Sequence, residues 1–214
     1  MSLPYDAVRH FHQPEGAYRF SADSVLLARF VDLKGVARAA DFGAGCGVVG
    51  LCALELHKDS ACPADFFFVE RQELLLKSLR LNLGLYAPAC RSRLQGLAAD
   101  WRDLRFSDFG GFLDYVMVNP PYSPISARPS NSPCRDEARR EVHGTLADLC
   151  LSLSRLLRPG GRAALMLPFR RREELRCCLA DCAFSLEREE LVKSQKKPDE
   201  ARLILLEARL ETAL

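Results

Sequence analysis

The four residues Asn119-Pro120-Pro121-Tyr122 combine a side-chain amide, a stiff turn and an aromatic ring. They follow the apolar run 112–118, which is typical of a buried strand in a parallel sheet. A central strand cannot continue through two prolines, because each lacks an N–H group for the ladder. The strand must therefore end at Asn119, at the edge of an open α/β sheet where ligands bind. An ordinary strand-ending turn would look the same, so a second motif has to decide.

That second motif is Asp41-Phe42-Gly43-Ala44-Gly45-Cys46-Gly47. Glycines at 43, 45 and 47 allow a tight turn and a close approach of the backbone to a ligand. Continued to Gly50, the stretch also spells the G-x-G-x-x-G of a dinucleotide fold, and Glu70 lies about where that fold has its ribose-binding acid. A nucleoside cofactor is therefore expected, with its ribose on Glu70 and its linker over the glycine turn.

Two further features separate the candidate cofactors. Asp41 comes directly before the glycines, where a carboxylate would repel a pyrophosphate but could hold an ammonium group. Asp100 and Trp101 close the third strand and offer an acceptor for an adenine amine and a ring for its face. A ligand with an amino-acid tail, a ribose and an adenine is S-adenosylmethionine (SAM), which these residues favour over NAD.

The elements that must position these residues alternate between strands and helices. Strands are expected at 38–42, 65–70, 93–99, 112–118, 162–167, 185–193 and 201–210, and helices at 22–33, 48–57, 72–83 (with Gly84 as its C-cap), 146–157 and 171–182. Alternating units predict an α/β, doubly wound, mostly parallel seven-stranded sheet, and the polar tip at 196–200 predicts a closing antiparallel hairpin. We expect a single domain over 1–214, with an entry segment and helix at 1–34 and a mobile active-site loop at 123–142.

Composition excludes several other classes of protein. The formal net charge is only +2, so a nucleic-acid partner would have to meet local basic clusters. The nine cysteines form no C-x-x-C pair and have no histidine at zinc spacing, which predicts reduced core thiols and no metal. No apolar run approaches the roughly 20 residues that span a bilayer, and a cytoplasmic protein is expected.

In this order, the glycine motif, Glu70, Asp100 and Asn-Pro-Pro-Tyr resemble the class I SAM-dependent methyltransferases that methylate amino groups. The resemblance covers nearly the whole chain and implies that residues 119–122 act on a planar nitrogen, either adenine N6 or a glutamine amide. Such a nitrogen is a poor nucleophile because its lone pair is delocalised. If the Asn119 side-chain oxygen and the Pro120 carbonyl accepted its two N–H bonds, it could pyramidalise, with Tyr122 stacked on a splayed-out base.

Residues 13–28 are similar to the entry segment of the bacterial tRNA1(Val) adenine-N6 methyltransferases, which modify the adenine beside the anticodon, position 37. The likeness implies that Tyr18, Arg19 and Asp23 lie near the methionine end of the cofactor, although helix capping explains Asp23 equally well. Release-factor glutamine methyltransferases resemble the same core but carry a larger helical domain in front, for which residues 1–40 are too few. Protein-glutamine methylation, methylation of another rRNA or DNA amine, and a non-catalytic SAM- or RNA-binding module stay as alternatives.

Basic residues give an independent indication of the substrate. Some follow the expected strands 162–167 and 185–193, whose carboxyl ends lie at the same edge as Asn119. Others occupy the loop after Tyr122. Their convergence predicts a phosphate-binding rim and an RNA partner, most simply a tRNA. The residues expected to bind it are Arg170, Arg171, Arg172, Lys193, Lys196 and Lys197, with Arg128, Arg135, Arg139 and Arg140 on the loop.

Overall fold

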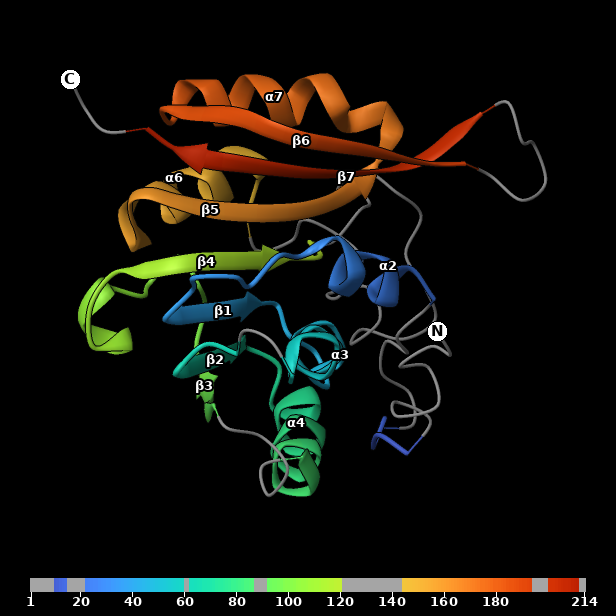
Figure 1. Cartoon of the computed structure of the whole chain (residues 1–214), viewed down its shortest axis with the longest axis vertical. Coiled ribbons are helices and arrows are strands. Elements are labelled where there is room, and N and C mark those ends of the chain that lie inside the picture. Colours follow the sequence, from blue (N-terminus) through green and yellow to red (C-terminus); the bar gives the residue numbers. More distant parts are fainter. Residues whose placement is uncertain are drawn as a thin grey trace.

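The computed structural model describes residues 10–14, 22–59, 62–86, 92–120, 144–193 and 200–211. Within them, seven strands form one sheet in the order β3-β2-β1-β4-β5-β7-β6 (Figure 1). The strands are β1 (Arg38–Phe42), β2 (Asp65–Glu70), β3 (Arg93–Ala98), β4 (Leu113–Val118), β5 (Leu157–Pro168), β6 (Phe184–Lys193) and β7 (Ala201–Leu210). All neighbours from β3 to β5 run parallel, whereas β7 is antiparallel to both β5 and β6. The predicted mostly parallel sheet with a closing hairpin is confirmed.

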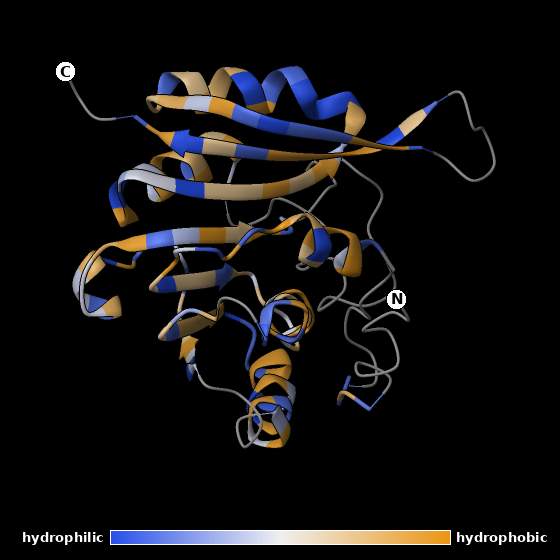
Figure 2. Cartoon of the chain, viewed as in Figure 1, coloured by the Kyte–Doolittle hydropathy of each residue, from blue (hydrophilic) through white to orange (hydrophobic). Residues whose placement is uncertain are grey.

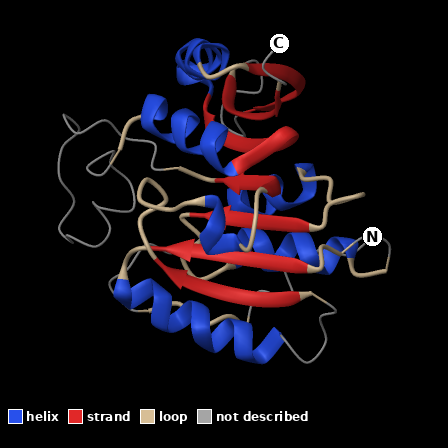
Figure 3. Cartoon of the chain, turned by 90° about the vertical axis from the view of Figure 1, so that its left-hand side faces the viewer, coloured by secondary structure: helices blue, strands red, loops and turns tan. Residues whose placement is uncertain are grey.

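Helices cover both faces of this sheet (Figure 1 and Figure 3). They are α2 (Ala22–Phe30), α3 (Val48–His57), α4 (Glu73–Tyr86), α6 (Leu146–Leu156) and α7 (Arg172–Asp181), with 3-10 turns η2 (Phe106–Phe109) and η3 (Phe169–Arg171). The buried residues of α2, α3 and α4 form one apolar core with the sheet, and those of α6 and α7 form a second. No helix among the described residues is long and apolar enough to cross a membrane.

The sequence accounts for this layering at the level of single side chains. Every residue of β2 is buried, and its phenylalanines alternate, with Phe66 and Phe68 in one core and Phe67 in the other. Helix α6 begins at a capping box, in which the Thr145 hydroxyl accepts the Asp148 N–H at 3.2 Å. The Asp148 carboxylate accepts the Thr145 N–H at 2.9 Å in return. Both the alternation in β2 and the start of α6 depend on residues close together in the sequence. Sequence patterns were therefore enough to locate these two elements.

Two predicted helix ends were wrong. Helix α2 stops at Phe30 rather than at 33, because the carbonyls of Phe30 and Asp32 accept hydrogen bonds from Arg188 and Arg162 of the hairpin and of β5. Gly84 does not cap α4 but lies inside it. The last turn of α4 continues to Tyr86, whose hydroxyl donates to the Glu55 carboxylate of α3 at 3.0 Å. Both corrections have a tertiary cause that helix propensity does not contain.

A buried polar cluster joins the hairpin to the centre of the sheet. The Glu207 carboxylate of β7 accepts the Tyr115 hydroxyl of β4, and it lies 3.4 Å from the guanidinium groups of both Arg162 and Arg188. The guanidinium of Arg162 stacks over the Tyr115 ring at 5.0 Å. Burial, with the charge of Glu207 beside it, raises the pKa of Tyr115 well above its ordinary value. Four strands are thus joined through one carboxylate.

Strand β6 is an outer edge of the sheet and its sequence is correspondingly polar. Most of its residues are exposed, and the strand is coloured largely as hydrophilic in Figure 2. The exposed charged residues include Glu187 and Glu190. Charges along an exposed edge discourage pairing with a further strand.

Candidate active site

The predicted site residues that follow β1, β2, β3 and β4 lie at one carboxyl edge of the sheet. Phe42 of β1 pairs with Val69 of β2 and with Val118 of β4, so Glu70 and Asn119 both lie one residue beyond that level. Adjacent strands are about 4.8 Å apart, which brings the ends of β2, β1 and β4 into one small region. The arrowheads of β1 and β4 point to this side in Figure 1.

The glycine turn leaves open space at this edge. Gly43, Gly45 and Gly47 have φ angles of 69°, 59° and 91°, a region that side chains of L-residues rarely adopt. A Cβ atom added at Gly43 or Gly45 would meet no atom within 4 Å, whereas one at Gly47 would lie 2.8 Å from the Leu79 side chain. The first two glycines therefore present bare backbone to an open space, as a ligand lying across the turn requires.

Glu70 is bound to that turn from the neighbouring strand. Its carboxylate accepts the Gly45 N–H at 2.8 Å and the Gln72 N–H at 2.7 Å, and the residue is only 6% exposed. Burial raises the pKa of Glu70, and the N–H groups of Gln72 and Gly45 oppose the rise. A carboxylate has about four lone-pair sites, so some accepting capacity remains beyond its backbone hydrogen bonds. The position and capacity of Glu70 fit the hydroxyls of a ribose.

Asp41 lies beneath the turn rather than above it. The residue is 1% exposed, and its carboxylate accepts the Gly50 N–H, in the first turn of α3, at 2.9 Å. Burial raises the pKa of Asp41 to about 7, the Gly50 N–H opposes this, and the charge of Glu70 adds to it. A cation close to Asp41 would lower this pKa, and the ammonium-binding role that the sequence suggested stays a prediction.

The third glycine of the dinucleotide-like spacing has a packing role. A Cβ atom added at Gly50 would lie 2.5 Å from the Phe68 ring and 2.7 Å from the Phe66 ring. Helix α3 can therefore rest on β2 only where no side chain intervenes. This explains the G-x-G-x-x-G spacing without a pyrophosphate.

Asp100 and Trp101 follow β3 at the same edge, since Ala98 pairs with Glu70. Arg102 donates to both Asp100 oxygens, at 3.0 and 2.7 Å. Burial acts to raise the pKa of Asp100, but the hydrogen bonds and charge of Arg102 hold it below the ordinary value. Asp100 is thus an ionised acceptor. If it also bound an adenine amine, it would accept hydrogen bonds from both that amine and Arg102.

The sequence analysis missed Asn82, which holds the glycine turn from the other side. This asparagine of α4 is 0% exposed, and its amide N–H groups donate to the carbonyls of Cys46, at 2.9 Å, and of His12, at 3.1 Å. Its side-chain oxygen accepts the His12 N–H at 2.7 Å. Both N–H groups and the oxygen of this buried amide are therefore hydrogen-bonded. Its signal was an amide among the leucines on the buried face of α4.

Several predicted residues lie outside the part of the chain that the structure describes. They are Tyr18, Arg19, Pro121, Tyr122, the loop 123–142 with its arginines, Lys196 and Lys197. Asp23 is described: its carboxylate accepts two hydrogen bonds from Arg202 of β7, at 2.6 and 2.9 Å. The structure therefore gives Asp23 a structural partner in β7, and both of its predicted roles stay predictions.

The predicted basic rim divides into paired and unpaired residues. Arg171 is buried and its guanidinium binds Glu174 at 2.6 and 2.8 Å, while that of Arg172 binds Glu189 at 2.9 Å. Both positive charges are neutralised within the protein. Arg170 and Lys193 are exposed at the carboxyl ends of β5 and β6. Among the described residues, these two are the better candidates for phosphate contacts.

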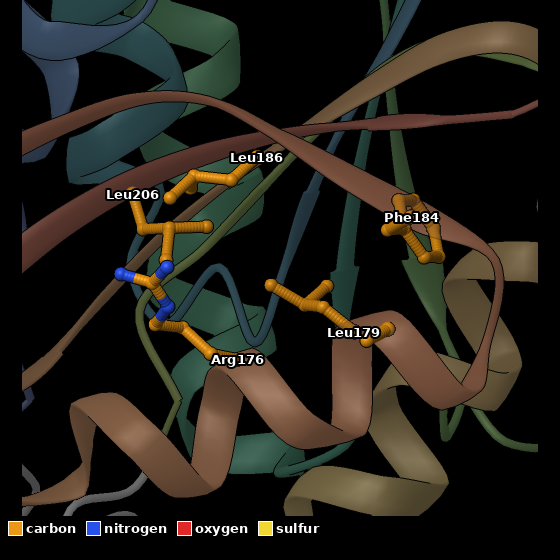
Figure 4. A pocket seen from close by; sticks show the side chains of 6 residues that line it. Arg176, Leu179, Phe184, Leu186 and Leu206 are labelled. Carbon is orange, nitrogen blue, oxygen red and sulfur yellow. The ribbon is translucent and has the colours of Figure 1, made fainter.

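An apolar pocket of about 200 Å³ lies elsewhere, between α7 and the hairpin (Figure 4). It is lined by Arg176, Leu179, Ala180, Phe184, Leu186 and Leu206. None of these belongs to the edge that gathers Glu70 and Asn119. The described residues also contain no cluster of His, Cys, Asp or Glu that could hold a metal ion. The candidate site is therefore the open edge above the glycine turn.

Comparisons with known proteins bear on this site. No protein-family model matches the sequence. The tRNA1(Val) (adenine(37)-N6)-methyltransferase of Shewanella sp. (strain MR-4) is 28% identical over 192 residues, 89% of this chain and 78% of the relative. The protein of the same name from Tolumonas auensis is 27% identical over 205 residues, 95% and 82% of the two chains.

Solved structures of methyltransferases share the fold. A methyltransferase from Pyrococcus furiosus has a TM-score of 0.62 at 16% identity, over 98% of this chain and 94% of that one. The ribosomal protein L11 methylase of Lactobacillus delbrueckii subsp. bulgaricus has a TM-score of 0.61 at 15% identity, over 94% and 86%. The Thermus thermophilus TrmN has a TM-score of 0.57 at 21% identity, over 87% and 48%.

Sheet order, glycine turn and relatives agree on the class. The chain is a class I SAM-dependent methyltransferase, and the residues around the turn fit that cofactor. Within this class it is similar to the bacterial tRNA1(Val) (adenine(37)-N6)-methyltransferases over most of its length, as its motifs suggested.

Proposed function

We propose that the protein methylates N6 of an adenine in RNA, specifically the adenine at position 37 of tRNA(Val). The observation that carries the proposal is the register of β1 and β4, which sets Asn119 and Pro120 directly beside the glycine turn. A methyl acceptor bound at Asn119 would face a cofactor lying on that turn. The printed activity of the similar proteins supplies the choice of RNA and nucleotide.

The residues of the chain would do their work by orientation. Bound SAM supplies a methyl group on a sulfonium, which is already activated for transfer. The Asn119 side-chain oxygen and the Pro120 carbonyl accept the two N–H bonds of the adenine amine, so its lone pair turns out of the ring plane toward the methyl group. Neither oxygen is a base at pH 7, so the proton that the methylated nitrogen sheds passes to water. Tyr122 stacks on the flipped base.

Methylation of one defined nucleotide tests this function. Purified protein, SAM with a labelled methyl group and a tRNA(Val) transcript are expected to give N6-methyladenosine after digestion to nucleosides and mass spectrometry. A transcript with guanine at position 37 is the matched control and is expected to stay unlabelled. Label in a glutamine of an added release factor, with none in either transcript, would instead support the protein-glutamine alternative.

The buried carboxyl of Asp41 predicts a pH dependence of SAM binding. Because its pKa is about 7 without ligand, the ionised form that attracts an ammonium becomes dominant only above that pH. The SAM affinity of the wild type, divided by that of Asp41→Asn, is expected to rise as the pH increases from 6 to 8. Calorimetric titration at the two pH values measures the ratio, and taking it cancels the titration of SAM itself. A ratio independent of pH would refute the role of Asp41.

The same shift has an opposite consequence for the stability of the protein without ligand. A raised folded-state pKa means that the carboxyl stabilises the fold while protonated, and that this contribution is lost as the pH rises from about 4 through about 7. Asp41→Asn keeps an acceptor for the Gly50 N–H but carries no charge. It is therefore expected to unfold with a free energy roughly 2–4 kcal/mol higher than the wild type at pH 8, with little difference at pH 4.

A further inference from the structure

The turn η3 combines two exposed residues with one buried residue. Arg171, at its end, is buried and paired with Glu174 through two hydrogen bonds of 2.6 and 2.8 Å, an arrangement that also lowers the pKa of Glu174. Phe169 and Arg170, at its start, are exposed, and the Phe169 side chain is 37% accessible to solvent. The ion pair between the buried Arg171 and the half-exposed Glu174 fixes the end of the turn, next to the exposed Phe169 and Arg170.

This turn lies beside the proposed catalytic residues. Strands β4 and β5 are parallel, with Val118 opposite Leu165, and β5 continues for three more residues before η3 begins. With a strand spacing of about 4.8 Å and a rise of about 3.3 Å per residue, Phe169 is roughly 10–15 Å from Asn119 at the same edge. That separation suits a nucleotide flanking the one that enters the site.

The two exposed side chains have no partner of their own in the described part of the chain. The aromatic pairs found there do not include Phe169, and none of its carboxylates pairs with Arg170. The two other large exposed rings, Phe106 and Phe112, differ in this respect, because they stack on each other at 4.6 Å. An unstacked ring next to an unpaired cation is the combination that binds an unpaired base and its phosphate.

We propose that Phe169 and Arg170 form a platform for a single-stranded nucleotide of the RNA substrate next to the target adenine. The base stacks on the Phe169 ring, and the Arg170 guanidinium contacts the adjoining phosphate. The proposal rests on the RNA methylation proposed above and assigns these residues a part in substrate binding. Arg171 acts only as the anchor of the turn.

Alanine and tryptophan at position 169 test the stacking. Phe169→Ala is expected to lower kcat/KM for the tRNA(Val) transcript by about ten- to a hundredfold, because the stacking surface is lost, with SAM affinity unchanged. Phe169→Trp keeps an aromatic face and is expected to retain most activity. Its fluorescence is expected to fall when the transcript is added, beyond any change in the wild type, whose one tryptophan is Trp101.

A matched control comes from the opposite edge of the sheet. Phe106 also begins a 3-10 turn and is 48% exposed, but η2 precedes β4 and so lies at the amino edge. Phe106→Ala is expected to leave kcat/KM unchanged. A Phe169→Ala enzyme as active as the wild type, or a Phe169→Trp fluorescence that ignores RNA, would overturn the platform while leaving RNA methylation intact. A wild type that methylates no RNA would overturn both proposals.

Salt dependence tests the phosphate contact separately. Each phosphate that a protein cation neutralises releases counterions, so the logarithm of RNA affinity falls with the logarithm of salt concentration. Arg170→Ala is expected to reduce the magnitude of that slope by about 1, the value for one phosphate contact, whereas Arg170→Lys preserves it. An unchanged slope in the alanine variant would exclude Arg170 from the platform.

Discussion

Asn119→Ala is expected to lower the turnover of RNA methylation at least about a hundredfold while SAM affinity stays within a few-fold. Removing one preorganised hydrogen-bonding group from the reacting centre typically costs a factor of about 100–1,000 in kcat. Asn119 follows β4, one residue beyond the Val118–Phe42 pair, whereas Glu70 and Asn82 make hydrogen bonds to the glycine turn. Chemistry and cofactor binding should therefore separate. Single-turnover rates with the tRNA(Val) transcript and SAM titrations measure the two.

The complementary variant is Glu70→Ala. It removes the carboxylate that accepts the Gly45 N–H and leaves Asn119 in place, so SAM binding is expected to weaken by about 1–3 kcal/mol. At saturating SAM its turnover should return toward that of the wild type. Normal turnover in Asn119→Ala, or an equal loss of SAM affinity in both variants, would refute the division of roles between the two strand ends.

Glu207→Ala is expected to cause the largest loss of stability, about 3–5 kcal/mol of unfolding free energy, because it leaves buried partners uncompensated. The carboxylate is 4% exposed and is shared by the Tyr115 hydroxyl and the guanidinium groups of Arg162 and Arg188. Arg188 is nearly half exposed and can be rehydrated, which favours the lower end of that range. Urea unfolding at neutral pH measures the change.

Two variants calibrate that result. Glu207→Gln keeps an oxygen for the Tyr115 hydroxyl and most of the volume, so its loss is expected to be clearly smaller than that of the alanine. Glu187→Ala breaks the pair that Glu187 forms with Arg209 on the exposed side of the same hairpin, and is expected to cost less than about 1 kcal/mol. Equal losses in Glu187→Ala and Glu207→Ala would show that burial of the Glu207 cluster contributes nothing.

The sequence by itself determined the order of the elements and the place of the candidate site. Both follow from local rules: apolar runs such as 65–70 must be buried strands, and Pro120 and Pro121 must end the strand that precedes them. Because parallel strands end at one edge, the residues after β1, β2 and β4 had to converge there. Glycines at 43, 45 and 47 could likewise be assigned to a ligand-binding turn, since few other residues tolerate their backbone angles.

Only the tertiary structure decided which polar side chains have partners within the protein. Arg171 and Arg172 looked equivalent to Arg170 in the sequence, yet Glu174 and Glu189 neutralise the first two and leave the third exposed. Asn82 holds the glycine turn through contacts with residues 36 and 70 positions away, which no periodicity encodes. Ion pairs and buried hydrogen bonds depend on distances between elements remote in the chain, so their partners appear only once the sheet and its helices are packed.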